Sequence, residues 1–335
     1  MAAACRQTKL ARSCINFIKE RRYSSQSTNI FNRTVKRQQR NNIATIENRK
    51  DFEYLKDEVA KRLVDRLQDI ERTFPLALDL GAGAGHIYKA LCEDDERFDI
   101  QELVQSDISE KLLQKSSASR NEDECLQMSY LAVDEEFLPF KKSHFDLIMS
   151  SLSLHWVNDL PSTFVQIREC LKPDGAFIGA VLGGDTLQEL RSAFILADQE
   201  RLGGISPHIS PFMNVADAGN LLQGAGFSLC TVDTDYIQVD YPNALTLMEH
   251  VQGMGENNAS VLKGRMTKDS LLAAASIYQA MYGLEDGLVP ATFQVIYLIG
   301  WAPHSSQKAP LRRGSAQQSL KDISTFHHKS NAPDK

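Results

Sequence analysis

The sequence predicts an α/β protein whose core is a doubly wound, mostly parallel sheet. From about residue 51 to residue 300, short apolar segments of strand type alternate with longer stretches of helical periodicity. One of these strands leads directly into a loop with three glycines at alternate positions, and a helical pattern follows the loop. An acidic residue ends the next strand, which is the arrangement of nucleoside sites in doubly wound sheets.

The individual elements follow from periodicity and from the residues that punctuate it. A helical pattern starts near Asp51, and several apolar residues recur at helical spacing through Leu67. The expected strands are 75–80, 102–105, 128–133, 145–150, 176–182, 229–239 and 292–300. The later expected helices are 186–201, 215–224, 244–254 and 270–281. A loop rich in Gly, Pro and Ser, at 203–211, belongs to a cap insertion expected at about 184–281.

Length and composition exclude several classes of protein. The chain has 335 residues, of which 42% are hydrophobic and 24% charged, so a sizeable core is possible and a wholly disordered chain is excluded. Its six cysteines include no C-x-x-C pair, which disfavours a disulfide scaffold and a thiolate metal site. No apolar run reaches the roughly 18 residues of a membrane span. We therefore expect the domain 51–302 to fold around its own core.

The first 40 residues differ from the rest in charge. They carry ten basic residues and a single acid, Glu20, and the apolar side chains of residues 10–18 share one helical face. This pattern is typical of a mitochondrial transit peptide, which we predict at 1–23 with cleavage after Tyr23. The alternatives are a basic disordered tail and an arm for nucleic acid. Removing 1–23 lowers the net charge from −6 to about −11, which argues against nucleic acid as a partner.

Two further segments lie outside the predicted domain. Residues 24–50 are polar, basic and rich in Asn and Gln, so we expect a linker or a loosely docked arm. Residues 303–335 lack periodicity and are expected to be a disordered tail.

The most informative motif is the glycine loop, in which Asp79 is followed by Gly81, Gly83 and Gly85. Glycine lets a ligand approach the backbone, and the N-terminus of the next helix offers free N–H groups. A dinucleotide fingerprint would require Gly or Ala at position 86, where this chain has His86. Asp107, at the end of the next strand, is placed to accept hydrogen bonds from both hydroxyls of a ribose. The alternative is that the glycines serve only tight turns.

The pattern Asp-x-Gly-x-Gly-x-Gly resembles the first motif of class I S-adenosylmethionine (SAM) methyltransferases. Four later signals occur in the order of that family, ending with the turn at 171–176 before the fifth strand. The resemblance implies a seven-stranded, Rossmann-like sheet with SAM as cofactor. The implied cofactor-binding residues are Asp79, Gly81, Gly83, Gly85, Asp107, Asp134, Glu135 and Ser151.

Candidate catalytic residues follow the fourth strand and lie in the cap: His155, Trp156, Asp185 and His208. Each has a plainer interpretation: Trp156 packs, His155 is a satisfied surface group, Asp185 caps a helix, and His208 is an exposed loop residue. The pair His144-x-Asp146 imitates an iron-binding motif but belongs to the start of the fourth strand, so we predict no metal site.

Beyond the core, residues 153–160 and 183–190 resemble bacterial malonyl-carrier-protein methyltransferases. Residues 206–212, 252–256 and 290–292, among others, are similar to the mitochondrial complex I (NADH:ubiquinone oxidoreductase) assembly factor 5 family. That resemblance implies an arginine hydroxylase that modifies a complex I subunit early in assembly, together with other assembly factors. It also implies peripheral residence on the matrix face of the inner membrane. Methyl transfer to a protein or to a carrier-linked carboxyl group, and a non-catalytic SAM-binding chaperone, remain alternatives.

Overall fold

The computed structural model describes residues 29–93, 100–118, 126–264, 266–308 and 314–315. The chain divides into two units, Met1–Pro303 and His304–Lys335. In the second unit, the described residues include a turn in which His304 Nδ1 lies 2.8 Å from Ser306 Oγ. The predicted transit peptide and most of the predicted tail lie outside the described residues. All further description concerns the first unit.

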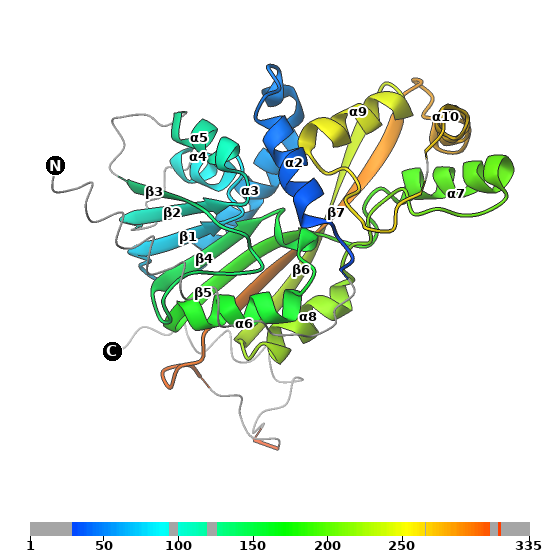
Figure 1. Ribbon diagram of the computed structural model, residues 1–335. Coiled ribbons are helices and arrows are strands. Elements are labelled where there is room, and N and C mark those ends of the chain that lie inside the picture. The colour runs from blue at the N-terminus through cyan, green and yellow to red at the C-terminus, as the bar shows by residue number, and fades with distance from the viewer. Residues whose placement is uncertain (1–28, 94–99, 119–125, 265, 309–313, 316–335) are drawn as a thin grey trace, which may run out of the picture. The chain divides into compact units, whose positions relative to one another are not determined.

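One seven-stranded sheet carries the fold (Figure 1). Its strands are β1 (Leu76–Leu80), β2 (Glu102–Asp107), β3 (Gln127–Ala132), β4 (Phe145–Ser151), β5 (Leu171–Leu182), β6 (Ser228–Tyr241) and β7 (Val289–Trp301). They lie in the order β3-β2-β1-β4-β5-β7-β6. The first five strands pair in parallel, and β7 is antiparallel to both β5 and β6. The predicted doubly wound, seven-stranded sheet is confirmed.

Helices cover both faces of this sheet, and side chains of alternating direction supply the two cores. Leu147 and Met149 of β4 belong to the core that contains α3 (Tyr54–Gln68) and α4 (His86–Glu93). Between them in sequence, Ile148 belongs to the opposite core, which contains α6 (Leu160–Cys170) and α8 (Val215–Gly224). β4 is therefore buried on both faces, as its nearly continuous apolar sequence predicts.

The remaining helices are α2 (Arg33–Ile43), the short 3-10 helices η1 (Arg49–Phe52) and η2 (Leu154–Trp156), α5 (Glu110–Ala118), α7 (Gln188–Leu202), α9 (Ala244–Met254) and α10 (Lys268–Tyr282). Figure 1 shows α7, α9 and α10 together at one end of the sheet. We call these three helices the cap, and the cap insertion expected at about 184–281 stays a prediction. By contrast, α8 and β6, which lie within the expected insertion at 184–281, are parts of the sheet and of its second core.

A docked helix stands where the sequence analysis expects a linker or a loosely docked arm. Helix α2 is capped by Asn32, whose side chain accepts a hydrogen bond from the backbone N–H of Val35 at 3.1 Å. Just before it, Phe31 is buried and pairs with Ser260 in a β-bridge. The backbone N–H of Asn32 donates to the carbonyl of Ala259 at 2.8 Å. The segment is therefore tied to the chain after α9, far away in the sequence.

Candidate functional site

The loops after the first four parallel strands meet at one edge of the sheet, because β3, β2, β1 and β4 are neighbours in that order. The backbone N–H groups of Gly81 and Ala82 both donate to the carbonyl of Ser106, at 2.7 and 2.9 Å. These bonds hold the glycine loop against the end of β2. The predicted residues lie at the carboxyl ends of these four strands or in the loops after them, and therefore at one edge of the sheet.

The glycine loop presents its backbone to a free space. Gly83 has a φ of +59°, and a Cβ added there would meet no heavy atom closer than His86 Cδ2, at 3.8 Å. A Cβ at Gly81 would instead lie 2.2 Å from Ser153 Oγ. Gly81 is thus required for packing against the loop after β4, whereas Gly83 leaves room for a ligand to touch the backbone.

Asp79 is the penultimate residue of β1, just before this loop, and is 1% exposed. Its Oδ2 accepts a hydrogen bond from Gln105 Nε2 at 3.3 Å, and within the described parts of the chain its Oδ1 has no hydrogen-bond partner. Burial raises the pKa of Asp79 to about 7, because the charged form loses its hydration. Asp79 Oδ1 is therefore a buried polar atom, next to the glycine loop, that is available to a ligand.

A partly enclosed cleft with a cavity volume of about 20 Å³ lies along the glycine loop. Helices α2 and α3, the loop after β4 and the end of α9 all contribute to its walls. Its lining residues include Arg40, Lys56, Gly81, Gly83, His86, Ser151 and Gly253. Leu152, which also lines it, has a φ of +48°, an uncommon value for a side chain of this size.

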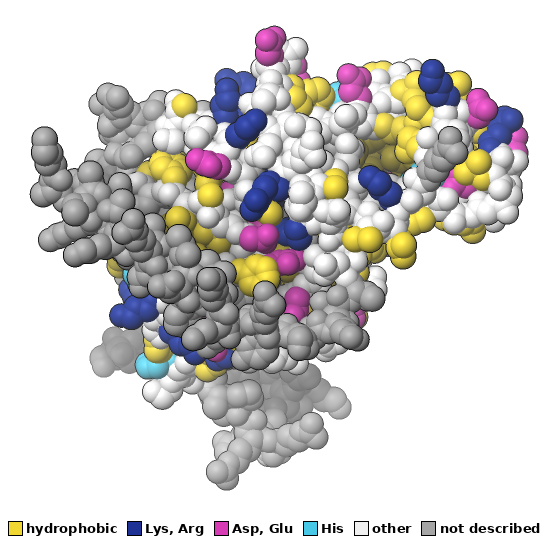
Figure 2. Space-filling model, viewed as in Figure 1, with side chains coloured by type: hydrophobic (Ala, Val, Ile, Leu, Met, Phe, Trp, Pro, Cys, Tyr) yellow, Lys and Arg dark blue, Asp and Glu magenta, His cyan; other side chains and the backbone are white. Residues whose placement is uncertain are grey.

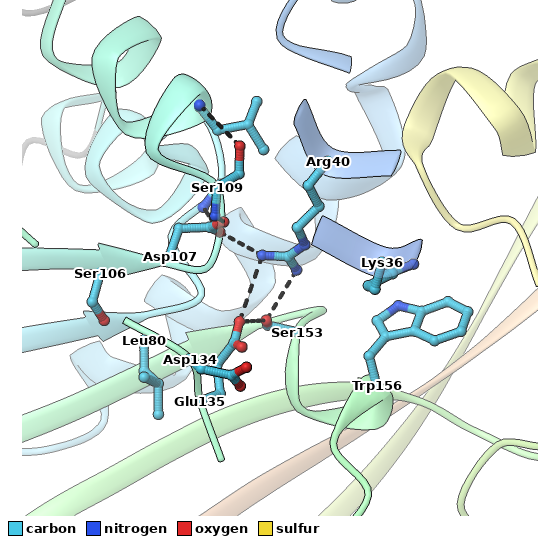
Figure 3. A network of polar contacts seen from close by, with 12 residues as sticks. Lys36, Arg40, Leu80, Ser106, Asp107, Ser109, Asp134, Glu135, Ser153 and Trp156 are labelled. Carbon is cyan, nitrogen blue, oxygen red and sulfur yellow. Dashed lines mark hydrogen bonds and ion pairs between the residues drawn. The ribbon is translucent and has the colours of Figure 1, made fainter. Parts of the chain in front are cut away.

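Helix α2 adds a positive charge to this site (Figure 3). Arg40 is buried and forms an ion pair with Asp107, the predicted ribose-binding carboxylate. Its other terminal nitrogen, Nη2, donates to Ser153 Oγ at 2.9 Å, and Nη1 lies 3.6 Å from Glu135 Oε1. Asp107 also accepts backbone hydrogen bonds from Gly83 at 2.9 Å and from Ser109 at 2.7 Å. Arg40 thus neutralises a buried carboxylate that has no other ion-pair partner among the described residues.

A second arginine of α2 covers the predicted adenine side. Arg33 Nη2 lies 2.7 Å from Asp134 Oδ1 and also pairs with Glu135, while Arg33 Nε lies 3.8 Å from Glu136 Oε1. Burial by itself would raise the pKa of Glu135, but Arg33 and Arg40 outweigh it and lower that pKa. The carboxylate of Glu135 is therefore held in its charged form.

The candidate catalytic residues His155 and Trp156 lie in η2, directly after the loop that follows β4. Both contact Glu256, which follows the end of α9. Trp156 Nε1 donates to Glu256 Oε2 at 2.7 Å, and His155 Nε2 lies 3.1 Å from the same oxygen. Burial lowers the pKa of His155, with Glu256 opposing the shift, so a neutral ring is favoured. A neutral ring that donates from Nε2 carries its lone pair on Nδ1, and within the described structure Nδ1 has no hydrogen-bond partner.

The other two candidate catalytic residues lie elsewhere. Asp185 is exposed, and its Oδ2 accepts a hydrogen bond from Tyr236 at 2.9 Å. It is not the helix cap, because α7 begins at Gln188 and no side chain caps it. The His208 side chain is only 3% exposed: its Nε2 lies 2.8 Å from Asp198 Oδ2, and its ring stacks on Phe194. The contact between His208 and Asp198 holds the loop 203–211 against α7. The catalytic roles of Asp185 and His208 stay predictions.

Sequence reasoning missed Arg33, Lys36, Arg40 and Glu256. The three basic residues recur at a spacing that places them on one face of a helix, and Phe31 and Ile43 bracket them. This helical spacing could have predicted a docked helix with a basic face, although the polar composition of 24–50 indicates a linker. Glu256 has no comparable local signal, because only the folded cap brings it to η2.

The residues present fit the predicted cofactor. Gly83 leaves space at the backbone, Asp79 Oδ1 and Ser151 Oγ are buried acceptors without hydrogen bonds among the described residues, and Asp107 stands at the end of β2. A SAM molecule in the cleft would place its methionine portion along the glycine loop and Ser151. Its ribose would reach Asp107 where Arg40 now contacts that carboxylate.

Comparisons with known proteins agree with this geometry. Residues 78–179 match the family model described as a methyltransferase domain. A putative methyltransferase from Bacillus halodurans has the same fold, with a TM-score of 0.52 at 15% identity, covering 73% of this chain and 99% of that one. The fold and site thus define a class I methyltransferase-type protein with a SAM site, which confirms the cofactor prediction.

Relatives of higher identity narrow the class. The human protein "Arginine-hydroxylase NDUFAF5, mitochondrial" is 52% identical over 306 residues, covering 91% of this chain and 86% of the human one. The "Malonyl-[acyl-carrier protein] O-methyltransferase" of a Methylovorus species is 30% identical, covering 76% of this chain and 85% of that one. The chain belongs to the NDUFAF5 arginine-hydroxylase family, and both predicted resemblances are confirmed.

Proposed function

We propose that this protein is a mitochondrial complex I assembly factor that binds SAM in the cleft and hydroxylates an arginine of a complex I subunit. The observation that carries the proposal is the 52% identity to an arginine hydroxylase over 91% of the chain. The alignment covers 91% of the chain, so it includes the cap and helix α2 as well as the methyltransferase domain. The proposal therefore concerns the whole site, including Glu256 and the basic residues of α2.

The site residues fall into two groups with different roles. Asp79, Gly81, Gly83, Gly85, Asp107, Asp134, Glu135 and Ser151 hold the cofactor in this proposal. His155 and Trp156, which lie in η2 a few residues after Ser151 and Leu152 of the cleft wall, are the catalytic candidates in this proposal. SAM supplies a charged sulfonium centre when it is bound. The neutral ring of His155 accepts a proton or a hydrogen bond at Nδ1, while Glu256 holds Nε2.

Methyl transfer is the second candidate, because residues 78–179 match a methyltransferase domain. An arginine guanidinium is a poor nucleophile until carboxylates align or deprotonate it, since its pKa is above about 12. The sequence alone shows no acidic residue at the reactive end apart from Asp159, and Asp159 caps α6, where it binds Ser162. Glu256 is a carboxylate that contacts the catalytic candidates His155 and Trp156, and this contact supports methyl transfer as the second candidate.

Mass spectrometry separates the two reactions. Complex I subunits are compared from cells that lack this protein, cells that express it, and cells that express the Gly83→Val variant. Hydroxylation predicts one added oxygen on an arginine only with the intact protein. One added methyl group instead would refute hydroxylation, and unmodified subunits in all three samples would favour a non-catalytic assembly role.

For the location of the protein, we propose the matrix face of the mitochondrial inner membrane, with a complex I subunit and other assembly factors as partners. No helix within the described residues is long and apolar enough to cross a membrane. The loop after Ser260 exposes Val261 and Leu262, the latter 81% exposed, beside Lys263. Figure 2 shows hydrophobic side chains gathered over this end of the molecule, across α7, α9 and α10. A peripheral contact with a membrane or a partner fits such a surface.

Two experiments test the location. A reporter fused to residues 1–40 should enter mitochondria and be cleaved near Tyr23, and a reporter that stays in the cytosol would contradict the transit peptide. Alkaline carbonate washing should release the protein from mitochondrial membranes, because peripheral contacts do not survive it. Retention in the washed membranes would contradict peripheral association.

A further inference from the structure

The side chain of Lys36 is buried in a box formed by parts of the chain remote from α2. Its Nζ lies 3.2 Å from the centroid of the Trp156 ring, donates to the carbonyl of Gly255 at 2.6 Å, and lies 3.7 Å from Glu256 Oε2. Figure 3 shows the lysine lying against the indole. An aromatic face, a carboxylate and a carbonyl are the three kinds of group that bind an organic cation.

The box does not depend on Lys36 for its construction. Trp156 Nε1 and His155 Nε2 both contact Glu256 Oε2, which joins η2 to the segment after α9 without α2. Phe212 packs its ring against those of His155 and Trp156, with centroids 5.8 and 6.4 Å apart. A preformed cation box therefore remains if Lys36 withdraws.

Lys36 leaves some of the acceptors around it without hydrogen bonds, and its ammonium group loses its hydration on burial. Lys36 is 1% exposed, and a lysine is rarely so deeply buried. Burial lowers its pKa, and the opposing effect of Glu256 does not make up the difference. Within the described structure no hydrogen bond reaches Glu256 Oε1, although Lys56 Nζ lies 3.3 Å from it. His155 Nδ1 likewise lacks a hydrogen bond.

A guanidinium would suit the same box better than an ammonium. It carries five N–H donors in a planar fork, against three on a lysine, and it is hydrated less strongly. Its plane can stack on Trp156 while its edges donate to Glu256 and to the carbonyl of Gly255. Exchanging one cation for the other also keeps the charge beside Glu256 unchanged.

We infer that Trp156, Glu256 and the carbonyl of Gly255 form the binding site for the arginine side chain of the protein substrate, and that Lys36 is an internal occupant which this arginine displaces. The inference rests on the proposed function, because that function supplies the arginine. It adds Glu256 as a substrate-binding residue and makes α2 a competitor of the substrate. The neutral analogue citrulline has the same shape but lacks the charge, so it should be rejected.

Trp156 provides a direct readout, because the chain has only two tryptophans. In the full chain with Trp301→Phe, the fluorescence of Trp156 is followed while a blocked tripeptide, acetyl-Ala-Arg-Ala-amide, is added. The citrulline tripeptide is the matched ligand control. Lys36→Met empties the box of its cation, Lys36→Arg keeps a cation there, and Arg37→Met removes an exposed charge from the same helix.

The arginine peptide should bind Lys36→Met about tenfold more tightly than it binds the unchanged chain, because no fraction of the sites is then blocked. Arg37→Met should bind it as the unchanged chain does, and Lys36→Arg should bind it no more tightly than that, because a guanidinium on α2 competes for the box at least as well as the lysine. Adding Glu256→Gln to Lys36→Met should abolish the gain, and the citrulline peptide should bind none of the variants. Equal affinity of Lys36→Met and Arg37→Met, or equal binding of both peptides, would overturn the inference.

Two further measurements keep this test independent of folding and of the reaction. Thermal melting and SAM calorimetry identify any variant that is misfolded, and if Glu256→Gln is one, the comparison of Lys36→Met with Lys36→Arg still decides. If arginine gains no oxygen in cells while the peptide behaves as expected, the proposed function fails and the binding site stands. If hydroxylation occurs but Lys36→Met binds no better, the inference fails and the function stands.

Discussion

Replacing Arg40 by Met should strongly destabilise the protein. Asp107 and Glu135 are 0% and 1% exposed, and Arg40 is an ion-pair partner of both. Glu135 keeps Arg33, but Asp107 keeps only backbone hydrogen bonds from Gly83 and Ser109. Methionine preserves most of the aliphatic stem, so the loss is mainly one of charge. Removing one partner of a buried ion pair costs about 3–5 kcal/mol, and we expect a loss of unfolding free energy in that range.

Urea unfolding at neutral pH measures this loss, and Arg37→Met, on the exposed side of α2, should stay within about 0.5 kcal/mol of the unchanged chain. Adding Asp107→Asn to Arg40→Met should restore part of the stability, because the second change removes the stranded charge. A loss below about 1 kcal/mol for Arg40→Met, or a double variant less stable than the single one, would refute the ion-pair argument.

Three more outcomes follow from the site and the cap. Gly83→Val should abolish SAM binding in calorimetry, because a branched side chain would enter the cleft. The control Gly203→Val, at a φ of +68° with no heavy atom within 4 Å of an added Cβ, carries similar backbone strain and should leave the SAM affinity unchanged. Burial raises the pKa of Asp79 to about 7 from an ordinary 3.8, so between these two pH values the folded protein binds one proton more than the unfolded chain. The unfolding free energy should therefore fall by up to about 4 kcal/mol as pH rises from about 4 to above 7, and urea unfolding of Asp79→Asn should not show that fall. His208→Ala removes the partner of the buried Asp198 carboxylate, so the unfolding free energy should fall by about 3 kcal/mol while SAM binding stays unchanged. A loss of SAM affinity in this variant would mean that the loop 203–211 contacts the cofactor.

The sheet was predictable because its signals are local. Most of the strands contain a short apolar run, and the glycines after Leu80 indicate a loop because glycine has a freer backbone. Strand boundaries were less predictable. β5 begins at Leu171, not near 176, because Phe145 of β4 pairs with Leu171 before the irregular turn at Asp174, where φ is +66°. Pairing with β4 sets where β5 begins, and the sequence of 171–182 by itself does not show which strand it will pair with.

The predicted cofactor residues meet because parallel strands place their carboxyl ends at one edge. Arg40 and Glu256 could not be predicted in this way. A buried arginine is tolerable only beside carboxylates such as Asp107, and those carboxylates are brought to it by tertiary structure. Composition alone describes α2 as a polar linker. The helix is stable because partners distant in the sequence bury its basic face.

The long sequence separations at α2 also bear on the order in which the molecule forms. The hydrogen bond from Lys36 to Gly255 joins residues 219 positions apart, and it needs the end of α9 already in place. Contacts that close such long loops have a high entropic cost until the intervening chain is structured. We therefore expect the sheet and the cap to assemble first and α2 to dock last. During that interval we expect the glycine loop and Asp107 to face solvent, so a nascent molecule offers its cofactor site before helix α2 covers it.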